Sequence, residues 1–192
     1  IMNRPEAIVM GASAGGVSAL LSVLAPLPAD FAIPVICVLH LPDDHDSQLA
    51  EVFTRKLRRP VREARDKERL EAGMIYVAGP GYHLSLEHDR SLSLSQEERV
   101  HFSRPSIDIL FESAADACGP ALVGVLLTGA NEDGAAGLAC IRERGGMTIV
   151  QDPAQAQVSI MPAAALALHR PDHILPLNGI GHLLAKLEAQ KC

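Results

Sequence analysis

Short continuous runs of apolar residues alternate along the chain with segments in which apolar positions recur every three or four residues. The runs at residues 33–39 and 121–127 are apolar throughout or nearly so, which is typical of strands buried on both faces of a parallel sheet. The strands predicted from such runs span residues 7–10, 33–39, 61–64, 74–77, 121–127, 148–151 and 174–177. Residues 82–86 and 91–94 flank a polar turn and predict an antiparallel hairpin.

Helical periodicity fills the intervals between these strands. Helices are expected over residues 17–24, from a cap at Asp46 or Ser47 to about Leu57, from Pro105 to about Cys118, after Gly134 to about Arg144, and over 161–168 and 180–188. This alternation predicts an α/β fold with a doubly wound, mainly parallel sheet, helices on both faces and one antiparallel hairpin. Without repeats or low-complexity linkers, residues 2–192 are expected to form a single domain, with Met2 as the native start.

Composition narrows the class of protein. The chain is 48% hydrophobic and 3% aromatic, with a net charge of −6. The hydrophobic fraction excludes a disordered chain, and the acidic balance with few aromatics argues against nucleic-acid binding. No apolar run is long enough to span a bilayer, so no direct membrane insertion is expected. The cysteines lack zinc-type spacing and are predicted to be free thiols in a reducing cytoplasm; they are Cys37, Cys118, Cys140 and Cys192.

The carboxyl end of the first predicted strand carries a glycine-rich turn at residues 11–16. Its G-x-S-x-G pattern between a strand and a helix is the context of a nucleophile elbow, with Ser13 as the candidate nucleophile. Backbone N–H groups beside it, from Ala14 first and then Gly15, are candidate donors to an oxyanion. A plain glycine turn and a loop that binds an anion at the helix N-terminus stay open as alternatives.

Two further predicted strands end in titratable side chains. His40 follows the second strand, and Asp133 lies in the loop of residues 128–134 after a buried strand. Asp133 is suited either to cap a helix or to orient a histidine and stabilise its imidazolium. Because the carboxyl ends of parallel strands meet at one edge of a sheet, these loops predict a nucleophile, a base and an acid in one place.

Other combinations of these residues remain to be weighed. A serine hydrolase of the order Ser…Asp…His would pair Asp133 with His169 or His173 instead of His40. His40 and His45 offer two metal ligands, but no third ligand has suitable spacing. We therefore expect neither a metal nor a cofactor.

Several motifs together resemble the catalytic domain of the chemotaxis receptor methylesterase family, the CheB type. They lie at residues 9–16, 40–42, 103–111, 127–137 and 161–162, within a likeness that runs from about residue 6 to about residue 187. The resemblance implies a triad of Ser13, His40 and Asp133 that works without a cofactor. It implies hydrolysis of glutamyl methyl esters, and often of glutamine amides, on the cytoplasmic helices of methyl-accepting chemoreceptors.

The resemblance also bears on the surroundings of the triad. With Ala14, an N–H group from the Ala130 loop is expected to bind the oxyanion, and Arg104 is a candidate for positioning the substrate or the loop. The family usually has Thr where Ala14 stands and Gly-Met-Gly where Gly129-Ala130-Asn131 stand, and an acidic cluster at residues 43–46 would alter the rim that faces the receptor. Members are commonly joined to a receiver domain. None is present in this sequence, so either the sequence is part of a longer protein or the protein is a stand-alone esterase, with a separate receiver domain as its regulator or with none.

Overall fold

A seven-stranded parallel sheet forms the centre of the protein. The computed structural model describes residues 4–41 and 48–188. The strands lie in the order β3-β4-β2-β1-β7-β8-β9, with each neighbouring pair parallel. Their bounds are β1 Ala7–Ala12, β2 Val35–Leu39, β3 Val61–Glu63, β4 Ile75–Val77, β7 Leu122–Leu126, β8 Met147–Gln151 and β9 His173–Leu175. The predicted hairpin forms a separate antiparallel pair, β5 His83–Leu86 with β6 Leu92–Ser95.

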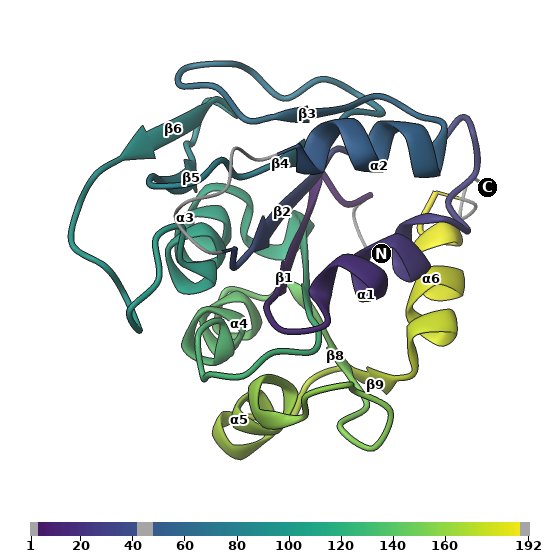
Figure 1. Cartoon of the computed structure of the whole chain (residues 1–192), viewed down its shortest axis with the longest axis vertical. Helices are drawn as coiled ribbons and strands as arrows, with labels where there is room; N and C mark the ends of the chain where they lie inside the picture. Colours follow the sequence, from purple (N-terminus) through teal and green to yellow (C-terminus); the bar gives the residue numbers. More distant parts are fainter. Residues whose placement is uncertain (1–3, 42–47, 189–192) are drawn as a thin grey trace.

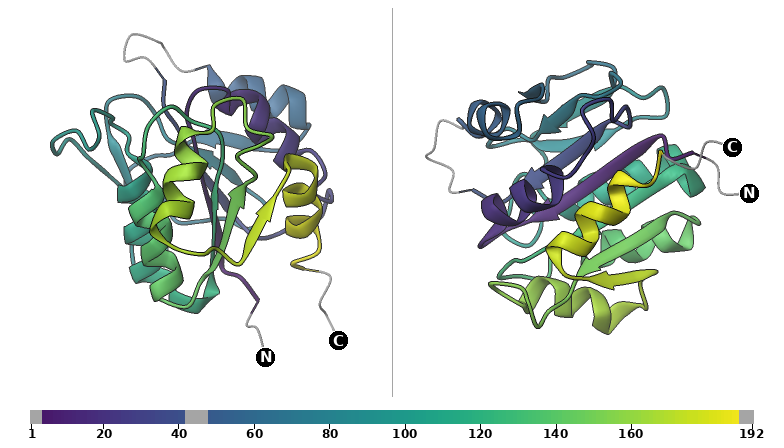
Figure 2. Two further views of the ribbon diagram at one scale, coloured as in Figure 1. Left: turned by 90° about the horizontal axis from the view of Figure 1, so that it is seen from below. Right: turned by 90° about the vertical axis from the view of Figure 1, so that its right-hand side faces the viewer.

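Helices cover both faces of the sheet (Figures 1 and 2). One face carries α1 (Gly16–Leu24), α2 (Leu49–Leu57) and α6 (Leu177–Ala185). The other carries α3 (Ile107–Cys118), α4 (Ala135–Glu143) and α5 (Ile160–Leu168), and a 3₁₀ turn at Gly119–Ala121 joins α3 to β7. The doubly wound fold class predicted from the sequence is confirmed.

The two layers of helices enclose two hydrophobic cores, one on each side of the sheet. Successive side chains of a strand point to opposite faces, so Ala7 and Val9 of β1 enter the core under α3, α4 and α5. Ile8, Met10 and Ala12 enter the core under α1, α2 and α6. Every residue of β1 is buried, which explains why the strand reads as a continuous apolar run rather than as an alternating one.

Some element boundaries differ from those predicted. β1 continues through Ala12 because Gly11 and Ala12 pair with Val38 and Leu39 of β2. Only glycine fits at position 11, since a Cβ there would lie 2.4 Å from Cγ2 of Ile107 in α3. The predicted strand at 174–177 ends at Leu175, since Pro176 lacks an N–H for the ladder, and Leu177 begins α6. Gln48 precedes α2 without a side-chain cap, and the predicted caps Asp46 and Ser47 lie outside the described residues.

The described cysteines are free thiols, as predicted. Cys37 and Cys118 are buried and Cys140 is partly buried, while Cys192 lies outside the described residues. Burial raises the pKa of the Cys37 thiol to about 12, so this thiol stays protonated at neutral pH. Among the described helices, none is long and apolar enough to cross a membrane.

Candidate active site

Hydrogen bonds between the strand ends bring the three predicted loops together. The N–H of His40, after β2, donates to the carbonyl of Ala12 at 3.1 Å. The N–H of Ser13, after β1, donates to the carbonyl of Thr128, after β7, at 2.9 Å. The chain runs outward from β1 through β2 on one side and from β7 through β8 on the other, so the loops meet where the strand order reverses, the usual place of a site in such a sheet.

Ser13 and His40 face a common cavity at this edge of the sheet. The cavity has a volume of about 330 Å³ and is also lined by the start of α1 and by Leu39 and Leu41. His40 borders a second cavity of about 230 Å³, whose other walls are Leu41, Arg99, Phe102, Ser103, Arg104 and Pro105. The imidazole therefore lies between the two cavities and can contact a ligand in either one.

Two helices begin at this edge with glycines in left-handed conformations. Gly15 before α1 has φ 79° and Gly134 before α4 has φ 95°, and neither of these N-cap residues has a side chain to cap its own helix. Both sites are also tight, since a Cβ on Gly15 would lie 2.7 Å from Oε1 of Gln157. Among the described residues, the N–H groups of Ala14 and Ala130 have no hydrogen-bond acceptor, which leaves them available to a ligand.

His40 and Asp133 form a hydrogen bond of 2.7 Å between Nε2 and Oδ2. The Asp133 side chain is fully buried, whereas that of His40 is 11% exposed. A carboxylate only accepts hydrogen bonds, so Nε2 carries a proton and the lone pair of a neutral imidazole resides on Nδ1. Nδ1 lies 3.5 Å from Oγ of Ser103, and no hydrogen bond joins His40 to Ser13 in the described structure.

The N-terminus of α3 surrounds Asp133 with hydrogen-bond donors. Its Oδ1 accepts from the Ser106 hydroxyl and from the N–H of Asp108, both at 2.9 Å. Its Oδ2 accepts from the N–H of Ile107 at 2.7 Å as well as from His40. Burial alone would raise the pKa of Asp133, but the hydrogen bonds from His40, Asp108 and Ile107 outweigh burial and hold this pKa below its ordinary value.

Asp108 in turn accepts hydrogen bonds at the N-terminus of α4, the helix that follows Asp133. Its Oδ1 accepts from the N–H of Gly134 at 2.9 Å and of Gly137 at 2.7 Å. Asp108 of α3 thus caps α4, and Asp133, from the loop before α4, caps α3. Burial, followed by the charge of Asp133, raises the pKa of Asp108 although the N–H of Gly137 opposes this.

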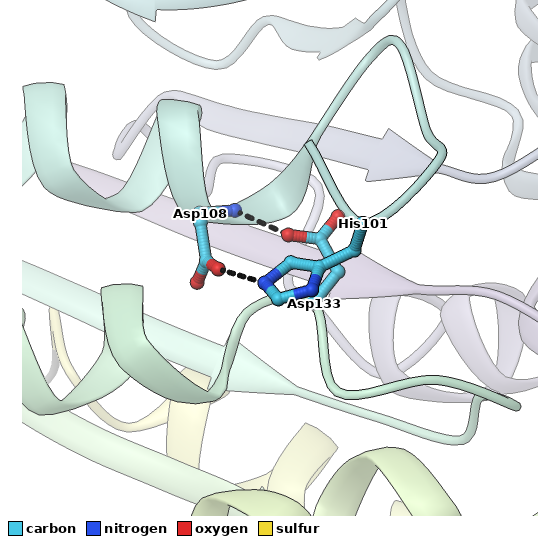
Figure 3. A group of neighbouring side chains, drawn as sticks. All are labelled: His101, Asp108 and Asp133. Carbon is cyan, nitrogen blue, oxygen red and sulfur yellow. Dashed lines mark hydrogen bonds and ion pairs between the residues drawn. The ribbon is translucent and has the colours of Figure 1, made fainter. Parts of the chain in front are cut away.

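His101, from the loop before α3, lies beside Asp108 and Asp133 (Figure 3). Its Nε2 lies 3.2 Å from Oδ2 of Asp108, and its ring approaches Asp133 closely enough for the three side chains to surround an ion. N–H and O–H donors already face both oxygens of Asp133 and one oxygen of Asp108. Such a donor set suits carboxylates rather than a cation, so these residues do not fit a metal.

The remaining candidates lie around the cavities or away from them. Nη1 of Arg104 donates to the carbonyls of Gln96 and Glu97, at 3.2 and 3.1 Å, and so holds the loop before α3. His169 follows the far end of α5, and His173 begins the edge strand β9. Asp133 bonds to neither, so the geometry gives the Ser…Asp…His alternative no support. The acidic cluster at 43–46, His45 included, lies outside the described residues.

Several site residues were not recognised from the sequence. Ser103, Ser106 and Asp108 all stand in the segment whose likeness to the family was noted, but periodicity gave them no role beyond opening a helix. Thr128 was assigned only to a loop, yet its hydroxyl donates to the carbonyl of Ala14 at 2.9 Å and joins the β1 and β7 loops. The available signal was position: Ser103, Ser106 and Asp108 lie close to Pro105, and Thr128 lies at the end of a strand.

The fold and the serine, histidine and aspartate gathered at its switch point define a class of protein first: a serine-type hydrolase on a doubly wound α/β sheet. A model of the CheB methylesterase family matches residues 8–184. The chain belongs to this family.

Individual relatives agree with this assignment. A protein of Leptospira interrogans, named provisionally as a protein-glutamate methylesterase/protein-glutamine glutaminase, is 44% identical over 183 residues, which are 95% of each chain. One from Bordetella avium, named protein-glutamate methylesterase/protein-glutamine glutaminase 1, is 43% identical over 95% of this chain, which spans 53% of that relative. The crystal structure of the Thermotoga maritima CheB methylesterase catalytic domain matches with a TM-score of 0.90 and 28% identity, over 95% of this chain and 98% of that one.

Proposed function

We propose that this protein hydrolyses glutamyl methyl esters, and also glutamine side-chain amides, on the cytoplasmic helices of methyl-accepting chemoreceptors. The reaction would take place in the cytoplasm and contribute to chemotactic adaptation. The observation that carries the proposal is the buried Asp133 bonded to His40, which shares a cavity with Ser13. Membership in a family of methylesterases supplies the substrate class.

In the proposed mechanism, Asp133 keeps the proton of His40 on Nε2, so that Nδ1 is the base. Nδ1 takes the hydroxyl proton as Oγ of Ser13 attacks the ester carbonyl, and a tetrahedral oxyanion forms. Ser13 and His40 are not hydrogen-bonded in the free enzyme, and such contacts often tighten only when substrate binds. Collapse of the intermediate breaks the bond to the methoxy oxygen, which leaves as methanol with the proton from Nδ1.

Water then completes the cycle through the same groups. Nδ1 takes a proton from a water molecule, whose oxygen attacks the acyl-enzyme, and the proton returns to Oγ of Ser13 as glutamate is released. For both tetrahedral intermediates, the N–H groups of Ala14 and Ala130 are the proposed oxyanion donors, since neither has an acceptor among the described residues. Gly15 would let the backbone approach the substrate closely, and Arg104 would position the loop before α3.

The proposal is tested by measuring methanol release from a methylated cytoplasmic fragment of a chemoreceptor. The unaltered protein should release methanol, and Ser13→Ala should lower the rate by about 10⁴-fold or more. Ser103→Ala is the matched control, because Ser103 is the serine hydroxyl nearest to Nδ1 of His40. That variant should retain activity within about tenfold. Full activity of Ser13→Ala, or abolished activity of Ser103→Ala alone, would show that Ser13 is not the nucleophile.

We further propose that a phosphoacceptor receiver domain controls access to the cavity of Ser13, as the family resemblance implies. The chain spans 53% of the Bordetella relative and 55% of one from Pseudomonas aeruginosa, but 95% of the Leptospira relative. The test is to add a cognate receiver domain in trans, with and without a phosphoryl donor. A change in the rate of methanol release supports this form of regulation, and an unchanged rate argues against it.

A further inference from the structure

A two-residue turn beside the active site has an unusual sequence. Val100 and Ser103 are paired through N–H···O bonds in both directions, at 3.1 and 2.8 Å. The two residues between them, His101 and Phe102, have φ values of 49° and 63°. Positive φ at both central positions is the pattern of a type I′ turn, for which Asn-Gly is strongly preferred. Two bulky residues in this conformation are strained, and such strain is found mainly at functional positions.

The turn is anchored through His101. Nε2 of His101 lies 3.2 Å from Oδ2 of Asp108 (Figure 3). Its Nδ1 lies 3.4 Å from Oε1 of Glu132. Arg104 holds the chain just after the turn by donating to two carbonyls of the incoming segment. Phe102 is therefore presented from a backbone that is tied down on both sides, rather than from a loose loop.

Phe102 itself is 96% exposed. The other three phenylalanines of the chain, Phe31, Phe53 and Phe111, are buried. Phe102 also lines the cavity that His40 borders, together with Arg99 and Arg104. A water-exposed aromatic ring on a fixed backbone at the rim of a site offers a large apolar contact, which is the property of an interface anchor.

We infer that Phe102 is a docking anchor for the substrate protein. Its ring packs against the apolar side of the glutamate-rich amphipathic helix that carries the ester. This inference rests on the proposed function. Residues three or four positions apart lie on one side of a helix, about 5–6 Å from each other. A helix that places its esterified side chain in the cavity of Ser13 can thus rest a neighbouring apolar residue on Phe102. Arg104 lines the same cavity, and its described hydrogen-bond partners are the carbonyls of Gln96 and Glu97, so its positive charge complements the glutamates that the reaction itself produces.

The test compares two substrates that share the reaction but differ in size. One is a methylated chemoreceptor cytoplasmic fragment, and the other is the γ-methyl ester of N-acetyl-glutamate amide, which has no helix to dock. Phe102→Ala should raise KM for the receptor fragment about tenfold while kcat stays within about twofold. The ratio of kcat/KM for the fragment to that for the small ester should fall by about the same factor.

Two further variants separate docking from folding. Leu168→Ala is the matched control, because Leu168 is an exposed apolar residue, 59% accessible, at the far end of α5; its substrate ratio should not change. Phe102→Gly relieves the positive φ, so it should keep or raise the Tm while lowering the ratio as Phe102→Ala does. An unchanged ratio in both Phe102 variants overturns the docking role and leaves the proposed function intact. If the unaltered protein releases methanol from neither ester, both the docking role and the proposed function are overturned.

Discussion

Individual side chains at the site differ in how far their roles could be read from the sequence. Ser13, His40 and Asp133 each follow a predicted strand, so the expectation that they meet needed only the rule that parallel strands share an edge. Asp108 is different, because its partners are N–H groups of a helix 26 and 29 positions later in the chain. Only the packing of α3 against α4 brings them together, and no local pattern encodes this packing.

Replacing Asp133 by Asn tests the histidine-orienting role at residue scale. Each oxygen of Asp133 faces two donors, so the amide group of Asn must oppose one pair of them, whichever way it turns. We expect kcat to fall by about 10³–10⁴-fold and the free energy of unfolding to fall by about 1–3 kcal/mol. Steady-state methanol release, measured where circular dichroism shows the variant folded, checks this. Glu143→Gln, at the end of α4, is the control, and a kcat for Asp133→Asn within tenfold of normal would contradict the role.

The raised pKa of Asp108 makes a prediction about pH and stability. A carboxyl whose pKa is higher in the folded than in the unfolded state disfavours folding when ionised, and this penalty disappears as pH falls through the raised pKa. Asn keeps an oxygen for the N–H groups of Gly134 and Gly137 but carries no charge. Asp108→Asn should therefore be at least as stable as the unaltered protein at pH 7.5, with the advantage shrinking towards pH 4. Urea unfolding at both pH values measures this, and a marked loss of stability at pH 7.5 would show that the charge itself is needed.

For Asp133, the pKa shift and its effect on stability have the opposite direction. Its lowered pKa means that it stabilises the fold above the ordinary pKa of an aspartate, and that this contribution is lost as pH falls through the lowered value. Protonation of Asp133 is thus expected to contribute to acid unfolding below about pH 4, and Asp133→Asn should flatten the decline of stability there. An equally steep decline in that variant would assign acid unfolding to other carboxylates.

At the scale of elements, existence and type were predicted better than boundaries. Each predicted strand and helix has a counterpart, and the hairpin of residues 82–94 forms as the polar turn indicated. The ends of several elements differ by a few residues from the predicted ones, as in β1, which includes Gly11 close to Ile107 of α3. The order of the strands was not predicted, since hydrophobic periodicity records which face is buried and not which strand lies next.

Two helical glycines distinguish packing from intrinsic helix propensity. A Cβ on Gly137 of α4 would lie 2.6 Å from Cβ of Phe111 and 3.1 Å from Cα of Asp108, both on α3. Gly137→Ala should therefore force α3 and α4 apart and destabilise the fold by about 1–3 kcal/mol. In α6, a Cβ on Gly179 would make only ordinary contact, at 3.4 Å, so Gly179→Ala should stabilise by about 0.5–1 kcal/mol. Urea unfolding of both variants is the measurement, and a Gly137→Ala variant at least as stable as the unaltered protein would contradict the close-packed α3–α4 interface.

At the scale of the whole molecule, the fold gathers segments that are far apart in the chain. Ser13 and His40 come from the first quarter of the sequence and Asp133 from its last third, yet hydrogen bonds between strand ends place their loops side by side. The net charge of −6 gives no information about this arrangement of the site. Arg99 and Arg104 line the cavity beside His40 although the chain as a whole is acidic, so the average charge does not describe the surroundings of the site.

The central claim is that Ser13 is the nucleophile of this site, and covalent labelling tests it most directly. A fluorophosphonate probe reacts with an activated serine and leaves a stable adduct that peptide mapping by mass spectrometry can locate. One adduct is expected, on the peptide that contains Ser13, and it should be lost in His40→Ala. An adduct on Ser103 instead, or an unlabelled Ser13 in a protein that still releases methanol from the receptor fragment, would contradict it.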